Sequence, residues 1–356
     1  MHCRHHLVGH DGSTAMSDTK VWTHLPTRAF GTTDMAITRV GFGAWAIGGA
    51  GWAASWGSQD DDASVAAIRH AAEVGINWID TAAVYGLGHS EEIVGRALRE
   101  IPADRRPYVF TKGGLVWDEA NRLAPPKRVG APDSLRREVE ASLRRLGVER
   151  IDLYQLHWPA EDGTSIETLW QTFLDLKREG KVRAIGLSNH NVELLTRAET
   201  VGHVDTLQPP FSAIRRDIAG AELPWCAEHR TGVIVYSPMQ SGLLTGTFTA
   251  ERAAALPQDD WRSRSPHFTG EGLARNLALA EALRPIAARH GTSVAAVAVA
   301  WTLAWPAVTG AIVGARSPAQ VDGWLDAATL ELTAEDLDEI AAAIEQTGAG
   351  TGPVRP

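Results

Sequence analysis

The alternation of short apolar runs with longer helix-like segments constrains this chain more than any other feature. Asp61 or Asp62 can cap a helix over 63–74, Ser90 can cap a helix that ends at 98, and residues 164–167 have the pattern of a capping box before a third helix. The apolar runs between such segments have strand length and lie at 40–45, 76–79, 108–111, 151–156, 182–187, 204–208, 233–236 and 310–313. Strands that alternate with helices pair in parallel, and eight of them in about 300 residues match the size of a (β/α)8 TIM barrel.

A single barrel domain is therefore expected over residues 28–346, with a short N-terminal hairpin that turns at 31–34 and a C-terminal tail over 347–356. Residues 1–27 are polar and His-rich and lack the apolar core of a secretion signal, so we expect a disordered extension. Its histidines do not have the spacing of a structural metal site, and no metal is expected.

The glycines within 41–46 fit the dinucleotide-binding pattern G-x-G-x-x-A, with acids at 60–62 near the spacing of a ribose ligand. That fingerprint requires the glycines to open a helix. Three further glycines follow within 48–51, and a helix interior would not tolerate them. We therefore predict a barrel strand here and reject a doubly wound dinucleotide fold.

Four side chains that can take part in acid–base chemistry lie at the predicted strand ends. Asp80, Lys112 and His157 each close one apolar run, and Tyr85 stands five residues after Asp80. In a parallel barrel these ends meet on one face. An ammonium lowers the pKa of a nearby phenol from its ordinary value of about 10, so Lys112 can activate Tyr85 while Asp80 holds the lysine. His157 can hydrogen-bond a substrate oxygen or relay a proton, and the group therefore predicts a general acid that acts on a carbonyl.

A resemblance to a known family rests on four segments that occur in this order within residues 30–330: Asp80-Thr81-Ala82, Tyr85-Gly86, Thr111-Lys112 and Leu156-His157-Trp158-Pro159. Together they resemble the aldo-keto reductases, which are similar in fold to the potassium-channel β subunits. The resemblance implies a bacterial aldo-keto reductase that reduces an aldehyde or ketone by hydride transfer from nicotinamide, with Tyr85 as proton donor. It also implies a catalytic tetrad of Asp80, Tyr85, Lys112 and His157.

The resemblance further implies a site for NADPH (NADP+) after the later strands. Amide and hydroxyl groups would hold the nicotinamide carboxamide: Ser188, Asn189 and Gln208. The segment after strand seven would stack on the nicotinamide ring and cover the pyrophosphate: Tyr236, Ser237, Pro238, Ser241, Gly242 and Leu243. The segment after strand eight would receive the adenosine 2′-phosphate: Gly314, Arg316, Ser317 and Gln320. Phe211, Ser212 and Trp324 depart from the residues that are common in the family at their positions.

Thirteen tryptophans against four tyrosines indicate an aromatic substrate pocket. Five of them fall in loops expected at the barrel mouth: Trp45, Trp52, Trp56, Trp117 and Trp158. Aromatic walls favour a substrate with a hydrophobic or planar part, although each tryptophan could instead simply cover the barrel mouth. Residues 250–270 have no clear period and are expected to form a mobile cofactor or substrate loop, or an irregular excursion.

Composition limits the remaining classes of function. A net charge of -9 gives no reason to expect nucleic acid as a partner. Cys3 and Cys226 are too few for a disulfide framework and fit a cytoplasmic location, and no apolar run of about 18 residues predicts a membrane span. The expected partner is a small carbonyl or alcohol substrate. Two alternatives to carbonyl reduction remain: a dehydrogenase that oxidises an alcohol, sugar or pyridoxal-like substrate, and a cofactor-binding regulatory subunit.

Overall fold

The computed structural model describes residues 25–257 and 260–356. The expected N-terminal extension lies outside these residues, apart from positions 25–27. Leu25 is buried, and strand β1 (Thr27–Ala29) pairs antiparallel with β2 (Ala36–Thr38). This pair confirms the predicted N-terminal hairpin.

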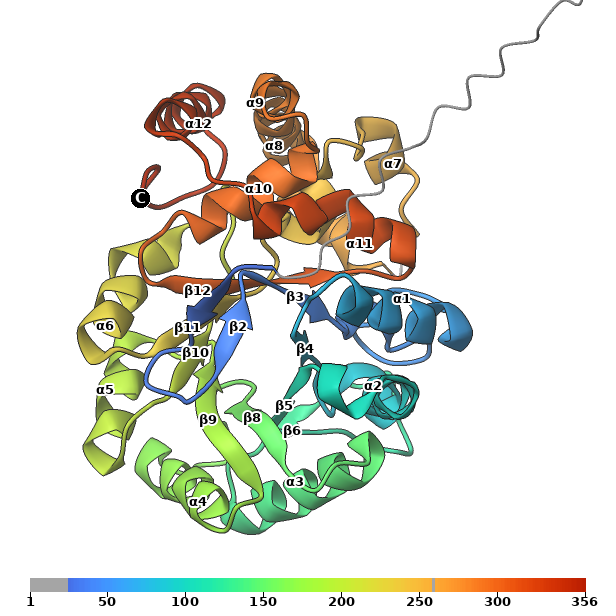
Figure 1. The fold of residues 1–356 in the computed structure, drawn as a ribbon, viewed down its shortest axis with the longest axis vertical. Helices are drawn as coiled ribbons and strands as arrows, with labels where there is room; N and C mark the ends of the chain where they lie inside the picture. The colour runs from blue at the N-terminus through green and yellow to red at the C-terminus, as the bar shows by residue number, and fades with distance from the viewer. Residues whose placement is uncertain (1–24, 258–259) are drawn as a thin grey trace, which may run out of the picture.

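Within the described residues, eight parallel strands form a closed barrel with helices on its outside (Figure 1). Around the barrel the order is β10, β11, β12, β3, β4, β5, β8 and β9, so consecutive barrel strands are neighbours. Their bounds are β3 (Val40–Gly43), β4 (Trp78–Asp80), β5 (Tyr108–Gly113), β8 (Ile151–Leu156), β9 (Val182–Ser188), β10 (Thr206–Gln208), β11 (Gly232–Val235) and β12 (Val308–Gly314). Each matches a predicted run, and the (β/α)8 fold is confirmed.

Helices follow the barrel strands and surround them. Their bounds are α1 (Asp61–Glu73), α2 (His89–Glu100), α3 (Pro132–Leu146), α4 (Ile166–Arg178), α5 (Val192–Val201), α6 (Glu222–His229), α7 (Ala250–Ala254), α8 (Gly270–Ala282), α9 (Arg284–Arg289), α10 (Val294–Leu303), α11 (Pro318–Leu325) and α12 (Ala334–Thr347). A small antiparallel pair, β6 (Leu115–Val116) and β7 (Lys127–Arg128), follows β5. Among residues 25–257 and 260–356, none of the helices combines the length and apolarity that crossing a bilayer would take.

Residues two apart on a strand share a face, and this period separates two layers inside the barrel. Trp78 and Phe110 belong to a buried apolar cluster that the hairpin closes. Asp80 and Lys112 lie two residues further along the same strands and form the polar layer above it. The apolar layer consists of Phe30, Met35, Ile37, Trp78, Phe110, Leu153, Ala184, Ile234 and Ile312. The polar layer therefore sits at the C-terminal strand ends, where barrel enzymes place their chemistry.

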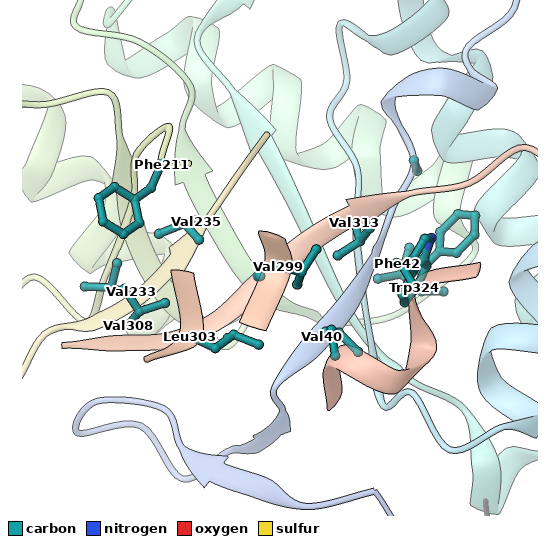
Figure 2. Close-up of a cluster of buried hydrophobic side chains, with 14 of the residues drawn as sticks. Val40, Phe42, Phe211, Val233, Val235, Val299, Leu303, Val308, Val313 and Trp324 are labelled. Carbon is teal, nitrogen blue, oxygen red and sulfur yellow. The ribbon is translucent and has the colours of Figure 1, made fainter. Parts of the chain in front are cut away.

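The larger core lies between the barrel wall and the helices. Figure 2 shows part of it, where Val40, Val233 and Val313 from three strands face Val299 of α10. Every residue of α10 is buried, so this helix is packed on all sides. Burial of apolar area on this scale is the main term that stabilises the barrel.

Three helix starts differ from the sequence prediction. Helix α1 is capped by Asp60, whose side chain accepts from Ala63 N, rather than by either of the two following acids. Ser90 lies inside α2, and its hydroxyl donates to the carbonyl O of Ala44 at 2.9 Å. Helix α4 is capped by Ser165, one residue after the start of the predicted capping box. Sequence patterns leave the first residue of a helix open where several adjacent polar residues could each serve as the N-cap. The backbone angles then decide which residue does so.

Residues 250–270 are an excursion with short helices of its own. It holds α7 and a 3₁₀ helix over Trp261–Arg264. Phe268 is buried and meets Phe248 and Trp261 edge-on, with ring centroids 5.5 and 5.9 Å apart. These contacts pack the described part of the segment, and both expectations for it stay predictions.

Candidate active site

Asp80 and Lys112 form a buried ion pair at the C-terminal ends of adjacent strands. Lys112 Nζ lies 2.5 Å from Asp80 Oδ1 and donates to the carbonyl O of Thr81 at 2.8 Å. Both side chains are at most 3% exposed. Burial raises the pKa of Asp80 and lowers the pKa of Lys112, and the charge of each partner opposes the shift of the other. The carboxylate is therefore placed where it holds the lysine.

Tyr85 reaches this pair from the loop between β4 and α2. The loop reverses through Gly86 and Leu87, which have φ values of 63° and 57°. A Cβ on Gly86 would lie 2.0 Å from the carbonyl O of Gly48, so the close approach of the two segments requires glycine. The Tyr85 hydroxyl lies 3.4 Å from Lys112 Nζ, and the ammonium lies 5.1 Å from the ring centroid. The loop thus brings phenol and ammonium into contact.

The pKa of Tyr85 is shifted in the direction opposite to the sequence prediction. Burial, with the negative charge of Asp80, raises this pKa well above 10. The predicted lowering by Lys112 is absent because Asp80 sits against the ammonium and offsets its charge, while the phenolate would lose its hydration. Tyr85 therefore keeps its proton at neutral pH.

His157 completes the group from the end of β8. Its ring meets the Tyr85 ring edge-on, with centroids 5.7 Å apart. Burial, with the charge of Lys112, lowers the pKa of His157 well below 6.5, so the imidazole is neutral near pH 7. Its Nδ1 is buried and has no hydrogen-bond partner among the described residues. A buried polar atom without a partner is costly, and a hydrogen bond from a bound molecule would offset that cost.

The residues predicted to hold the nicotinamide lie together beside the ion pair. Gln208 Nε2 donates to Asp80 Oδ2 at 2.8 Å, and Ser188 Oγ donates to the carbonyl O of Gln208 at 2.8 Å. Asn189 has a φ of 64°, and its Oδ1 accepts from the Tyr236 hydroxyl at 2.7 Å. Three strand ends thus converge on one polar cluster.

Gln155 is a site residue that sequence reasoning missed. It lies on β8 two residues before His157, and its Oε1 accepts from Gln208 Nε2 at 3.2 Å. Its Nε2 makes no hydrogen bond of ordinary geometry among the described residues, but it lies close enough to the Asp80 carboxylate to oppose the rise in that group's pKa. The strand period of two would have placed Gln155 on the same interior face as His157.

The loop after β11 has the backbone shape of an anion site. Ser237, Ser241 and Gly242 have φ values of 55°, 52° and 104°. Successive residues in such conformations can direct backbone N–H groups toward one side, which suits a phosphate. Pro238 is buried, and Leu243 is fully buried in the core, so Leu243 can offer only its main chain to a ligand.

Arg316 is engaged by the loop that precedes α1. Its Nε lies 2.5 Å from Gln59 Oε1, and its Nη2 donates to the carbonyl O of Ser58. Its backbone N donates to Gln320 Oε1 at 2.8 Å, and Ser317 makes no side-chain cap bond to α11. The guanidinium predicted to meet a 2′-phosphate therefore has protein partners here. Sequence reasoning missed Gln59, because the contact joins segments 257 residues apart.

The predicted pocket tryptophans gather around Tyr85. Trp45 stacks on the Tyr85 ring with centroids 6.2 Å apart, and Trp52 tilts against it at 6.3 Å. Trp56 meets Trp45 edge-on at 5.2 Å. Two more, Trp117 and Trp158, pack with Tyr85 against one small buried cluster of Ala82, Val84 and Leu115.

Two contacts of this aromatic wall were not predicted. Trp261, from the 250–270 excursion, meets Trp56 edge-on with ring centroids 6.5 Å apart. The guanidinium of Arg128 lies 4.7 Å from the ring centroid of Trp158. The wall is therefore built from four separate loops, which only the fold brings together.

Comparison with known families decides the class of this barrel. Residues 39–345 match the aldo/keto reductase family. The chain belongs to the aldo/keto reductase family. The match covers all eight barrel strands and the four strand-end residues described above.

Several relatives of this aldo/keto reductase share most of its length. It is 35% identical to aldo-keto reductase YhdN of Bacillus subtilis over 316 residues, which cover 88% of this chain and 92% of that protein. It is 34% identical to the NADH-specific methylglyoxal reductase of Escherichia coli over 330 residues, with 89% and 98% covered. The solved glycerol dehydrogenase of Gluconobacter oxydans has a TM-score of 0.83 and 39% identity, with 92% of this chain and 97% of that chain covered.

Aldo/keto reductases use nicotinamide cofactors, and the residues of this reductase fit one. The buried Nδ1 of His157 lacks a partner among the described residues, and the backbone O of His157 accepts from Asn189 Nδ2 at 3.0 Å, within the cluster predicted for the carboxamide. The left-handed turns after β11 suit a pyrophosphate. Gly314, the exposed last residue of β12, and Arg316 stand where the adenosine end is predicted.

Proposed function

We propose that this aldo/keto reductase reduces an aldehyde or ketone to an alcohol with NADPH. The observation that carries the proposal is the 3.4 Å contact between the Tyr85 hydroxyl and Lys112 Nζ, beside the buried Asp80. The bound nicotinamide would supply the hydride. Tyr85 keeps its proton at neutral pH and can donate it from the hydroxyl to the carbonyl oxygen, which becomes basic as the reaction proceeds. Lys112 then stabilises the phenolate that remains.

His157 and the tryptophans orient the substrate in this proposal. A neutral imidazole can donate one hydrogen bond to the carbonyl oxygen without competing for the proton of Tyr85. Trp45 and Trp52 flank the Tyr85 ring. Their apolar faces favour a carbonyl compound with a planar or hydrophobic part.

The preference for NADPH is supported by Arg316. A guanidinium can form paired, charge-assisted bonds to a phosphate, and Ser317 has a hydroxyl that caps no helix. To bind a 2′-phosphate, Arg316 would exchange its contacts with Gln59 and Ser58 for the phosphate oxygens. The competing expectation is NADH, because the Escherichia coli relative is named as NADH-specific.

Alcohol oxidation is the second candidate function. It is favoured by the likeness to the Gluconobacter oxydans protein, which is named a glycerol dehydrogenase. The same residues serve the reverse reaction, because Tyr85 would then accept the proton that leaves the alcohol. Initial rates with carbonyls and reduced cofactor, compared with rates for alcohols and oxidised cofactor, separate the two directions.

The test of the main proposal is the Tyr85→Phe variant in stopped-flow assays with NADPH and a panel of carbonyls. The ring remains but the only dissociable proton is lost, so turnover should fall by about 10²–10⁴-fold while the cofactor Kd stays the same. Tyr108→Phe is the matched control, since Tyr108 lies at the opposite end of β5 and packs against Arg183. Near-normal turnover in Tyr85→Phe would refute the assignment. Tight cofactor binding without turnover of any carbonyl or alcohol would favour a regulatory subunit instead.

A cytoplasmic location belongs to the proposal. It is supported by the presence of only two cysteines in 356 residues, which fits a reducing compartment. Cell fractionation with an antibody to the chain is the direct test.

A further inference from the structure

A second buried acid, Glu91, lies behind the candidate active site. Its side chain is fully buried, although it carries a carboxylate. Glu91 Oε1 accepts from the Thr111 hydroxyl at 2.6 Å, and Glu91 Oε2 lies 2.6 Å from Arg145 Nε. A buried charge is rare unless it is paired and hydrogen-bonded, and here both oxygens have a partner.

The two bonds of Glu91 join the segments that carry the proton donor and its lysine. Glu91 is in the first turn of α2, and α2 directly follows the loop that positions Tyr85. Thr111 precedes Lys112 on β5, and it faces away from the barrel interior because neighbouring residues on a strand alternate sides. Glu91 therefore binds the outer face of β5, next to the residue Lys112 that projects into the barrel.

Helix α3 closes the same network from the other side. Arg145 is near the C-terminal end of α3 and is 19% exposed, so the pair with Glu91 is largely shielded from water. Glu138, earlier on the same face of α3, accepts from Gly114 N at 2.7 Å and from the Ser134 hydroxyl at 2.9 Å. The end of β5 is thus held by two carboxylates on its outer side.

The titratable and charged groups around Lys112 come from several elements. They are Asp80 on β4, Tyr85 in the following loop, His157 after β8, Glu91 on α2, and Arg145 and Glu138 on α3. Asp80 is the partner in direct contact. The negative charge of Glu91 acts in the same direction as that of Asp80, because both oppose the lowering of the pKa of Lys112 by burial.

We propose that Glu91 is a positioning residue for the reaction: through Thr111 and Arg145 it fixes α2 against β5 and so sets the distance between Tyr85 and Lys112. The inference rests on the proposed function, in which that distance governs proton donation. A misplacement of about 1 Å can lower a rate by about 100-fold, so a brace of this kind is consequential although it touches no substrate. An ion pair that only stabilises the fold would change the free energy of unfolding, whereas this one also fixes the distance between Tyr85 and Lys112.

The test compares Glu91→Gln with Thr111→Val. The glutamine keeps the shape of the side chain and removes its charge, and the valine removes only the hydroxyl that Glu91 binds. We expect kcat to fall about tenfold in Glu91→Gln and less in Thr111→Val, with the cofactor Kd within twofold of the wild type in both. The alkaline limb of the kcat profile should move to lower pH in Glu91→Gln only, because loss of a negative charge disfavours the ammonium of Lys112.

A readout without turnover separates this inference from the proposed function. The chain has five lysines, so the ¹³Cε signal of Lys112 in selectively labelled protein can be assigned from its loss in Lys112→Met. Its titration should move to lower pH in Glu91→Gln, whether or not a substrate is known. If the wild type turns over no carbonyl, the proposed function fails while this titration still tests the link between Glu91 and Lys112.

The matched control is Asp336→Asn. Asp336 is equally buried, pairs with Arg289 and His290, and lies on α12, remote from the barrel mouth. It should lower the melting temperature as Glu91→Gln does and leave kcat and the Lys112 titration unchanged. An equal loss of kcat in both variants, or an unchanged kcat and titration in Glu91→Gln, would show that Glu91 only stabilises the fold. Should Glu91→Gln not fold, an unchanged kcat in Thr111→Val would overturn the proposal.

Discussion

Replacement of Lys112 by methionine tests the electrostatic centre of the site, because it leaves Asp80 buried without its cation. Both side chains are at most 3% exposed, and their charged atoms are 2.5 Å apart. Removal of one partner from a buried pair costs about 3–5 kcal/mol. Gln208 Nε2 still donates to Asp80 Oδ2 at 2.8 Å, and a bond to a charged group contributes about 1.5–3 kcal/mol. We therefore expect the lower end, a loss of about 3 kcal/mol in the free energy of unfolding at pH 8.

The size of this loss should depend on pH. Burial already raises the pKa of Asp80, and loss of Lys112 raises it further, because the charge that opposed the shift is gone. A group with a raised folded-state pKa binds its proton more tightly in the folded protein. Its contribution to stability is present at low pH and is lost as the pH rises through the folded-state pKa. The loss in the free energy of unfolding caused by Lys112→Met should therefore shrink from pH 8 toward pH 5.

Urea unfolding of wild type and Lys112→Met at pH 5, 6.5 and 8 measures the loss in the free energy of unfolding at each pH, provided that their m-values agree. The double variant Asp80→Asn/Lys112→Met should recover much of the loss, since it leaves no buried charge. Lys181→Met, which breaks a half-exposed pair with Glu140, should cost no more than about 1 kcal/mol. A loss below about 1 kcal/mol in Lys112→Met, or a deficit that does not vary with pH, would refute the reasoning.

Three further outcomes follow from the same geometry. Arg316→Ala should raise the Kd for NADPH by about 10- to 100-fold and leave that for NADH unchanged in fluorescence titrations, whereas equal weakening would make the arginine structural. His157 has a pKa well below 6.5, so the rate profile between pH 6 and 8 should contain no inflection that disappears in His157→Gln. Burial raises the pKa of Cys226 to about 12, so a thiol reagent at pH 8 should label it in Cys3→Ser protein only after urea is added, and labelling of the native protein would contradict its burial.

The barrel was predictable because its signals are local. Apolar runs of strand length and the helices between them depend on residues within a few positions of each other. The run at 151–156 coincides with β8, and the others differ from their strands by one or two residues at one or both ends. The helix caps were less predictable. At α1 three consecutive acids compete for one cap, and the extended backbone of Asp60, with φ -79° and ψ 127°, decides between them.

The sequence by itself determined that Asp80, Lys112 and His157 close three parallel strands, and that Tyr85 follows one of them. It could not determine how these groups titrate. The pKa of Tyr85 rises because the phenol is buried beside an ion pair, and burial is a property of the assembled barrel. Nor could it find the partners of Arg316 and Glu91. Gln59 is 257 residues from Arg316 along the chain, and Arg145 is 54 residues from Glu91. Only the closed barrel brings such groups within hydrogen-bond distance, because a side chain's partners are set by which elements pack together and not by its neighbours in sequence.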